Sequence, residues 1–293
     1  MTLPSDPFPA RFTSHSDVPA IVEIIISFFE DSKEDLLKLS LVGHDWVDRS
    51  RYHLFHNFPC SALLDTISKI HTFSEIMASP SSTFFNRPFS ELTISVKLDQ
   101  LHPTKDYTNI LNPIFQRTLV SNSVDINLDT FISPILWHGL HSWKGLSSLS
   151  IAAIIPSLKT LAMVIPALHQ LNALNFDASF IDPTVPGLPA DSVVLPCNFS
   201  SLHLGTRGYS LLSWLALYDC PIESLTLKIK AEDILPLRSY AIVNGGNLLY
   251  LDVTFFNDEK IEGKSPFHVN SVVSDAFGSP RFCILYAIDA IFA

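Results

Sequence analysis

The side chains best suited to chemistry in this sequence are histidines at short spacing. His53 with His56, and His138 with His141, are each three residues apart, so each pair could share one metal ion. Neither pair has a third ligand nearby, and both stand among aromatic or amphipathic-helix residues. Surface or packing roles are therefore favoured, and no metal site is predicted.

Recognisable catalytic motifs are absent from the chain. It has no G-x-S-x-G elbow, Walker loop or H-E-x-x-H motif, and Gly245-Gly246 is its one glycine doublet. Carboxylates far apart in sequence could still meet in the fold, but nothing selects a pair. The sequence predicts no catalytic residue and no cofactor, and an enzyme with an unrecognised site is the most distant alternative.

Charge and cysteine usage narrow the partners and the compartment. The net charge is −10, the pI is about 5.5 and no run of Lys or Arg occurs, which argues against a nucleic-acid partner. The four cysteines, Cys60, Cys197, Cys220 and Cys283, stand singly, as is typical of reduced thiols. We therefore expect a cytoplasmic or nuclear protein.

Residues 151–168 form an apolar run long enough to suggest a membrane helix. Lys159 at its centre would cost about 3 kcal/mol on insertion, and Pro156 and Pro166 interrupt it. The run therefore predicts a buried part of a globular fold, and no membrane partner is expected.

Three short helices are predicted in residues 17–58, after a flexible lead-in at 1–16. Asp17 and Pro19 are suited to the start of the first helix. Ser32 followed by Asp35 predicts a capping box for the second helix, which Gly43 can end. The third helix, from residue 44 to about 55, has ordinary amphipathic spacing and is expected to turn Asp48, Arg49, Arg51 and His53 to solvent.

The first two helices are apolar on more than one face. Along the first helix only Glu23 and Ser27 are polar interior positions, and leucines crowd the second. A unit of about forty residues cannot bury two opposed apolar faces within itself. Either the rest of the chain or a foreign protein is therefore expected to cover the second face.

This block resembles an F-box, in the F-box-like version of the large adaptor families of mushroom-forming fungi. The resemblance rests on Val18-Pro19, the isoleucine-rich first helix, Ser40-Leu41-Val42, Trp46, and the Ser50-Arg51 and Leu54-Phe55 pairs. It departs from the pattern at Val18, where Leu is usual, and at Gly43-His44. The resemblance implies docking on a Skp-type adaptor, and through it on a cullin–RING ligase, by Val18, Pro19, Ile21, Ile25, Leu37, Leu41, Val42 and Trp46.

A degenerate repeat follows in residues 89–293, after a connecting helical segment at 59–88. The pattern L-x-x-L-x-L occurs in FSELTI, LSSLSI, LNALNF, FSSLHL, IESLTL and LLYLDV, with a weaker copy in SNSVDINL. The central residues are Leu92, Val124, Leu149, Leu174, Leu202, Leu225 and Leu251, at intervals of 32, 25, 25, 28, 23 and 26 residues. These intervals are inside or near those of leucine-rich repeats.

Each copy predicts a short strand, and the segments between copies predict helices that return the chain to the next strand. The predicted fold is α/β: a three-helix F-box-like unit followed by an irregular leucine-rich-repeat solenoid with a parallel sheet. Irregular turns are expected because the usual Asn or Cys after each copy is replaced, at Ile154, Ser179, Arg207, Lys230 and Phe256. A generic α/β domain with recurring leucines is the alternative.

Polar residues between the inward leucines are expected on the concave face of such a solenoid. Their mixed chemistry suits recognition of a target protein, although each could simply be a solvated strand position. The predicted target-binding residues are Asn172, Asn175, His203, Glu223, Lys228, Tyr250 and Asp252. From about residue 257 the repeat lapses, and the apolar end at 281–293 predicts a buried cap, a chain that ends within the solenoid, or a truncated or alternatively spliced product.

The sequence therefore predicts a non-catalytic substrate-receptor adaptor of a Skp–cullin–F-box ubiquitin ligase. The alternative is a protein-interaction scaffold, outside any ligase, whose N-terminal helices are an internal cap.

Overall fold

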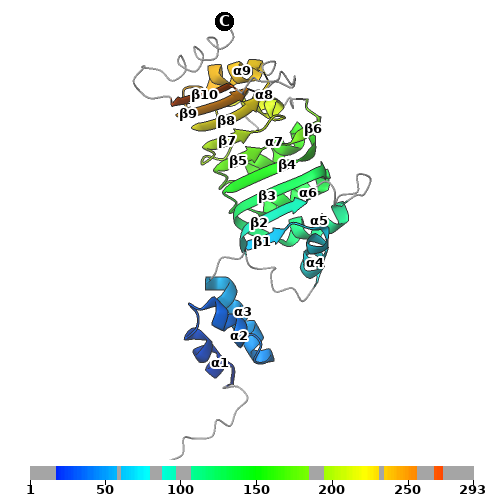
Figure 1. The fold of residues 1–293 in the computed structure, drawn as a ribbon, viewed down its shortest axis with the longest axis vertical. Coiled ribbons are helices and arrows are strands. Elements are labelled where there is room, and N and C mark those ends of the chain that lie inside the picture. Colours follow the sequence, from blue (N-terminus) through cyan, green and yellow to red (C-terminus); the bar gives the residue numbers. More distant parts are fainter. Residues whose placement is uncertain are drawn as a thin grey trace, which may run out of the picture. The chain divides into compact units, whose positions relative to one another are not determined.

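The computed structural model describes residues 18–57, 61–79, 88–96, 107–184, 195–230, 234–255 and 267–272. The chain divides into two compact units, Met1–Cys60 and Ser61–Ala293 (Figure 1). The lead-in at 1–16 and the apolar end at 281–293 lie outside the described residues.

The first unit holds three helices: α1 (Val18–Ser27), α2 (Lys33–Leu39) and α3 (His44–Asn57). The predicted start of α2 is confirmed, because the Ser32 hydroxyl accepts from the Asp35 amide at 3.3 Å and donates to Asp35 Oδ2 at 2.7 Å. The helix reaches its C-cap at Ser40, three residues before the expected stop at Gly43.

A small apolar core joins the three helices. Val22 and Ile26, four residues apart on α1, are buried together with Leu36 of α2. Leu39, Trp46 and Leu54 pack against them and are partly buried. The first unit therefore buries one stripe of α1. The apolar side chains on the remaining faces of that helix do not belong to this core.

The second unit is built on a ten-stranded sheet in the described part of the chain. Its path runs in chain order, apart from β6, which pairs with β4 beyond the end of β5. Pairings among the first nine strands are parallel, and the last strand is antiparallel to β9. The strands are β1 (Ser61–Leu64), β2 (Pro88–Val96), β3 (Leu119–Phe131), β4 (Ser148–Ser157), β5 (Ala173–Phe176), β6 (Ser179–Asp182), β7 (Ser201–Leu204), β8 (Ser224–Ile229), β9 (Tyr250–Phe255) and β10 (Phe267–Val272).

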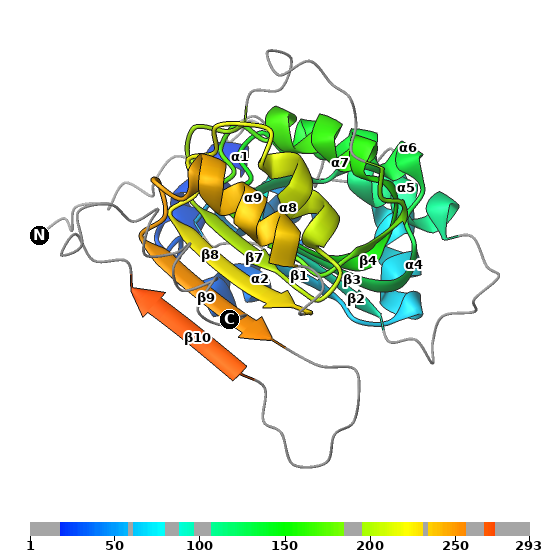
Figure 2. The ribbon, with the colours of Figure 1, turned by 90° about the horizontal axis from the view of Figure 1, so that it is seen from above.

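The helices of this unit all cover the same face of the sheet (Figure 2). They connect successive strands, as parallel pairing requires. Between β6 and β7 no helix occurs in the residues that are described. The helices are α4 (Ile67–Ala78), α5 (Thr108–Arg117), α6 (Pro134–Gly139), η2 (Leu140–Ser142), α7 (Leu158–Val164), η3 (Ile165–Ala167), α8 (Tyr209–Leu215) and α9 (Ile234–Asn244).

The central residues of the sequence repeat form one continuous row across the sheet. Leu92 pairs with Val124, which pairs with Leu149, and the row continues without a shift through Leu174, Leu202, Leu225 and Leu251. Every member is buried under the helices. The predicted strands, their parallel pairing and their inward leucines are thus confirmed.

One segment differs from what the sequence predicted, and a second is mostly buried, as predicted. Residues 59–88, expected to be a helical connection, contain α4 and also strand β1, which pairs with β2 through Ala62 and Leu92. The run at 151–168 is divided among β4, α7 and η3. No helix in the described part of the chain has the length and apolar character to cross a bilayer.

Candidate binding surfaces

The first unit exposes apolar side chains at the end of α2. Leu41 is 85% exposed, Val42 63% and Leu37 47%. All three belong to the predicted adaptor-binding set. Among the described residues of the first unit, none covers these three side chains.

The remaining members of that set are arranged differently. Ile21 and Ile25 are partly buried on α1, and Trp46 packs against the core. Val18 and Pro19 begin α1, and their side chains lie outside the described residues. The set is therefore a mixture of surface and core positions.

Three further apolar side chains of the first unit are exposed and were absent from the predicted set. They are Ile24 in α1 and Phe28 and Phe29 in the turn after it. The sequence does indicate such exposure. The first helix is apolar at nearly every position, whereas one buried stripe uses only every third or fourth residue. Together, Ile24, Phe28, Phe29, Leu37, Leu41 and Val42 are named here the apolar face.

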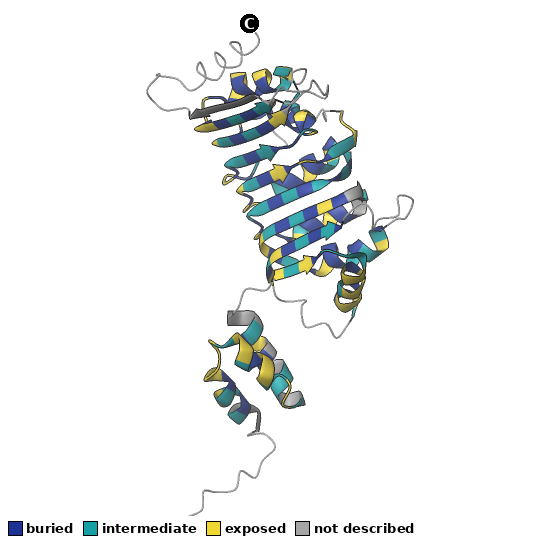
Figure 3. Cartoon of the chain, in the orientation of Figure 1, coloured by how far each residue is buried: buried dark blue, intermediate teal, exposed yellow. Residues whose placement is uncertain are grey.

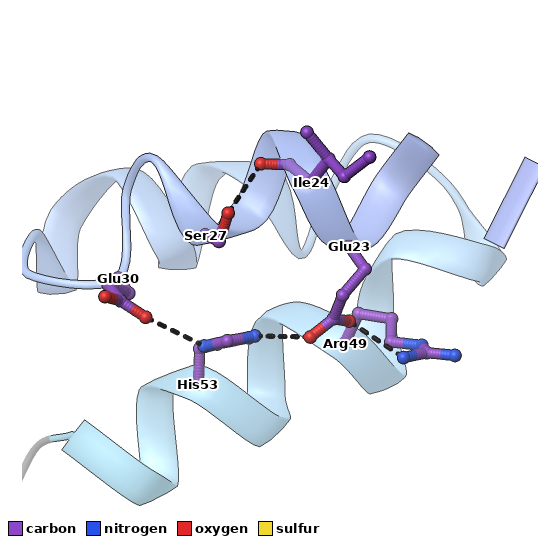
Figure 4. A network of polar contacts seen from close by, with 6 residues as sticks. All are labelled: Glu23, Ile24, Ser27, Glu30, Arg49 and His53. Carbon is purple, nitrogen blue, oxygen red and sulfur yellow. Dashed lines mark hydrogen bonds and ion pairs between the residues drawn. The ribbon is translucent and has the colours of Figure 1, made fainter. Parts of the chain in front are cut away.

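A polar network joins α1 to α3 (Figure 4). Arg49 Nη1 donates to Glu23 Oε2 at 2.8 Å, and His53 Nε2 lies 2.8 Å from Glu23 Oε1. His53 Nδ1 also lies 3.8 Å from Glu30 Oε2. The hydrogen bond to His53, followed by that to Arg49, holds the pKa of Glu23 below its usual value although burial opposes the shift.

The position of His53 corrects the expectation that it faces solvent. Its residue is 9% exposed because the ring lies between the carboxylates of Glu23 and Glu30. The amphipathic pattern of α3 placed His53 on the polar side of that helix. This side faces Glu23 of α1, so His53 is covered although it is polar. Arg49 is exposed, as expected, but is paired with Glu23.

None of the described helices of the second unit lies on the other face of its sheet (Figure 2). Strand positions alternate between buried and partly exposed, which is visible along the strands in Figure 3. We call this side the open face and describe it by rows that run across the strands. Row one is Glu91, Ser123, Ser148, Ala173, Ser201, Ser224 and Tyr250; row two is Thr93, Asp125, Ser150, Asn175, His203, Thr226 and Asp252.

The structure brings together most of the predicted target-binding residues. Asn175, His203 and Asp252 lie in row two, Tyr250 lies in row one, and Lys228 pairs with Thr254 one step beyond row two. These five share one end of the open face.

Asn172 and Glu223 lie instead in the turns that lead into the strands. The Asn172 carbonyl accepts from the amides of Ser200 and Ser201, and the Glu223 carbonyl accepts from the amides of Leu249 and Tyr250. The main chains of both residues therefore align neighbouring strands. The Asn172 side-chain Oδ1 accepts from the Ser200 hydroxyl at 3.4 Å.

His203 is half-buried at the centre of this end. Burial lowers its pKa below the ordinary value, and the positive charge of Lys228 lowers it further. The carboxylates of Asp177 and Asp252 oppose this shift. The neutral ring is thus favoured in the folded chain.

Gly205 is a feature of the open face that sequence reasoning missed. A Cβ placed on Gly205 would overlap the Asp177 carboxylate, so the missing side chain leaves the space that this carboxylate occupies. The sequence does not reveal this role of Gly205, because Asp177, which fills the space, is distant from it along the chain.

Of the histidine pairs and single cysteines noted in the sequence, the side chains of His56, Cys60 and Cys283 lie outside the described residues. His138 and His141 stack with ring centroids 6.0 Å apart. In the described portion, no group of three or more His, Cys, Asp or Glu side chains could hold a metal ion. Burial raises the pKa of the Cys220 thiol to about 12, so it is protonated at neutral pH.

No protein-family model matches the chain, and no curated protein matches it.

Proposed function

We propose that this chain is a substrate-receptor adaptor of a Skp–cullin–F-box ubiquitin ligase. In this proposal residues 17–58 are an F-box-like unit that docks on a Skp-type adaptor. Residues 89–293 are an irregular leucine-rich-repeat solenoid that holds a target protein. The chain would act by bringing the target close to the transferase, in the cytoplasm or nucleus, and would make or break no bond itself.

The observation that carries the proposal is the apolar face of the first unit. Several large, exposed apolar side chains on a small domain are typical of an interaction site. Burying five such side chains at about 1.5–3 kcal/mol each would gain roughly 8–15 kcal/mol, which is enough to outweigh a typical cost of association. The face therefore has enough apolar surface to support a stable complex.

The sequence resemblance identifies which partner would cover this face. Leu41 and Val42 belong to the Ser40-Leu41-Val42 triplet on which the resemblance to F-boxes rests, and both are exposed. The row of repeat leucines and the helix-free side of the sheet support the second part of the proposal, because leucine-rich-repeat solenoids bind partners on such surfaces.

Binding to a purified Skp-type adaptor tests the proposal. We expect the wild-type chain to bind in isothermal titration calorimetry, and a Leu41→Ser, Val42→Ser double variant to bind at least tenfold more weakly, since two apolar side chains are lost from the contact. Leu235→Ser is the matched control, because Leu235 is 66% exposed on α9 of the second unit.

Two results would overturn the proposal: a wild-type chain that does not bind the adaptor, or a double variant that binds as well as wild type. Either result would favour the scaffold in which the N-terminal helices are an internal cap.

A further inference from the structure

The outer side of α9 is apolar. Among the described helices α9 is the last in the chain, and it lies at the same end of the second unit as β9 and β10 (Figure 1). Helix α8 packs against it on one side. Leu235 is 66% exposed, Ile242 52% and Val243 43%, and their spacing places them on one side of the helix. These three residues are named here the α9 face.

The helix at the opposite end of the second unit differs from α9. Helix α4 exposes mainly polar side chains, and Ile76, at 40%, is its one large apolar side chain that is exposed. Its exposed polar residues are Ser68, Lys69, His71, Thr72 and Glu75. A polar outer side is what the terminal element of a repeat array needs. The apolar α9 face therefore indicates that a further element covers it.

The direction of β10 brings the residues that follow it towards this face. Strand β10 runs antiparallel to β9, and its last residue, Val272, pairs with Tyr250, the first residue of β9. A short segment joins Asn244, at the end of α9, to Tyr250, and Leu249 within it is 54% exposed. Residue 273 therefore follows from the end of the sheet at which α9 also ends.

The sequence of residues 281–293 is typical of a buried helix. Only Arg281 and Asp289 in this stretch are charged. Ser279 and Pro280 are suited to the N-cap and first turn of a helix. Apolar residues then recur at spacings of three and four. They include Ile284, Leu285, Ile288, Ile291 and Phe292.

Such a helix would match α9 in length and lie within reach of it. Residues 281–293 would form a helix of about 20 Å, and α9 spans about 16 Å. Residues 273–280 can extend to about 26 Å, which exceeds the separation of about 8–10 Å between packed helices. Because the chain leaves β10 at the end of the sheet where α9 ends, the added helix would run antiparallel to α9.

We propose that residues 281–293 form a helix that packs on the α9 face and closes this end of the repeat array. In this arrangement Cys283, near the start of the helix, lies close to Ile242, and Phe292, near its end, lies close to Leu235. The inference goes beyond the proposed function and does not depend on it, because it concerns the second unit alone.

Crosslinking of the native Cys283 tests this arrangement in the full chain. A Cys197→Ser background removes an exposed thiol. In that background Ile242→Cys should form a link to Cys283 within one chain when a short bismaleimide is added to dilute protein. Leu235→Cys should link much less, since it lies about 10 Å further along α9. Mass spectrometry of the digested protein identifies the links.

Met163→Cys is the control for crosslinking, because Met163 is 50% exposed on α7, on the same side of the sheet. It should give no link to Cys283.

The rate at which Cys283 reacts with a maleimide is a second measurement. Cys283 in the wild-type chain should react more slowly than the exposed Cys197. Ile242→Asp should speed the labelling of Cys283 by about tenfold, since a charge on the α9 face opposes the packing of an apolar helix. Ile76→Asp on α4 is the matched control and should leave the rate unchanged.

The inference is overturned if Ile242→Cys gives no link to Cys283, or one no stronger than Met163→Cys gives. It is also overturned if Cys283 labels as fast as Cys197 in the wild-type chain, which would leave the α9 face to a foreign partner. Links that join two chains would make a second copy the occupant, and would overturn it as well.

Discussion

Asn244 shows how one buried side chain can fix the turn that leads into a strand. It is fully buried at the end of α9, where its Oδ1 accepts from the Cys220 amide at 2.8 Å and its Nδ2 donates to the Leu215 carbonyl at 3.5 Å. Asn247 Nδ2 donates to the Cys220 carbonyl at 2.9 Å. These bonds hold the turn that leads into β8, whereas the replaced positions after each repeat copy, such as Lys230, follow the strands.

Replacing Asn244 with Ala should therefore destabilise the second unit by about 1–3 kcal/mol, because a buried amide and a buried carbonyl lose their partner. Urea unfolding followed by circular dichroism measures the change. Asn109→Ala, at an exposed position of α5, should stay within about 0.5 kcal/mol of wild type. Equal effects of the two substitutions would contradict the structural role of Asn244.

His203 should make the stability of the second unit depend on pH. Its pKa in the folded chain is lower than the ordinary 6.5, so below about pH 6.5 the unfolded chain binds more protons than the folded chain. The free energy of unfolding should therefore fall as pH decreases through 6.5 towards the folded pKa. The stabilising contribution of the neutral His203 ring is complete above about pH 6.5. Above that range the neutral ring is common to both states and no further change is expected from His203.

Urea unfolding at a series of pH values between about 5.5 and 8 tests this dependence. His203→Gln should flatten the curve below pH 6.5, whereas His169→Gln, at an exposed turn position, should leave it as in wild type. A curve for His203→Gln that matches wild type would show that this ring does not carry the dependence.

At the scale of elements, α1 is held by two unlike contacts. Val22 and Ile26 bind it to the apolar core, and Glu23 binds it to α3 through Arg49 and His53. Because these contacts lie on adjacent stripes of one helix, they fix its rotation as well as its position. The orientation of Ile24 and Phe28 on the apolar face follows from that rotation.

Glu23→Gln should loosen α1 by about 1 kcal/mol, a modest value because the Glu23 side chain is 34% exposed and its pairs are partly screened. Its lowered pKa means that the contribution is present above about pH 4.5 and is lost as pH falls through the folded pKa, and the Gln variant should lack this acid loss.

Native-state hydrogen exchange of the α1 amides measures the loosening of this helix. Glu34→Gln is the control, since its pair with Lys38 is highly exposed and within α2. Unchanged exchange in α1 with Glu23→Gln would show that the apolar core alone orients the helix.

At the scale of the whole molecule, the sequence predicted the strands that belong to the repeat and missed the elements that occur only once. The row from Leu92 to Leu251 could be predicted from two periods in the sequence. Apolar residues alternate within each repeat copy, and the copies follow one another at about 25 residues. Strand β1 lacks the repeat pattern, and β10 reverses direction, so neither had a periodic signal. The exposed Leu41 and Val42 followed from counting apolar residues against the space available, whereas the burial of His53 depends on a partner thirty residues away.

The unshifted central row of leucines, on strands paired in chain order, has a consequence for variation of this architecture. In the interior of the sheet each strand with its helix contacts chiefly the steps on either side of it, so one whole step could be gained or lost without altering how the others match. Evolution could therefore lengthen or shorten such a surface in increments of about 25 residues, adjusting its reach while leaving the chemistry of the surviving steps in place.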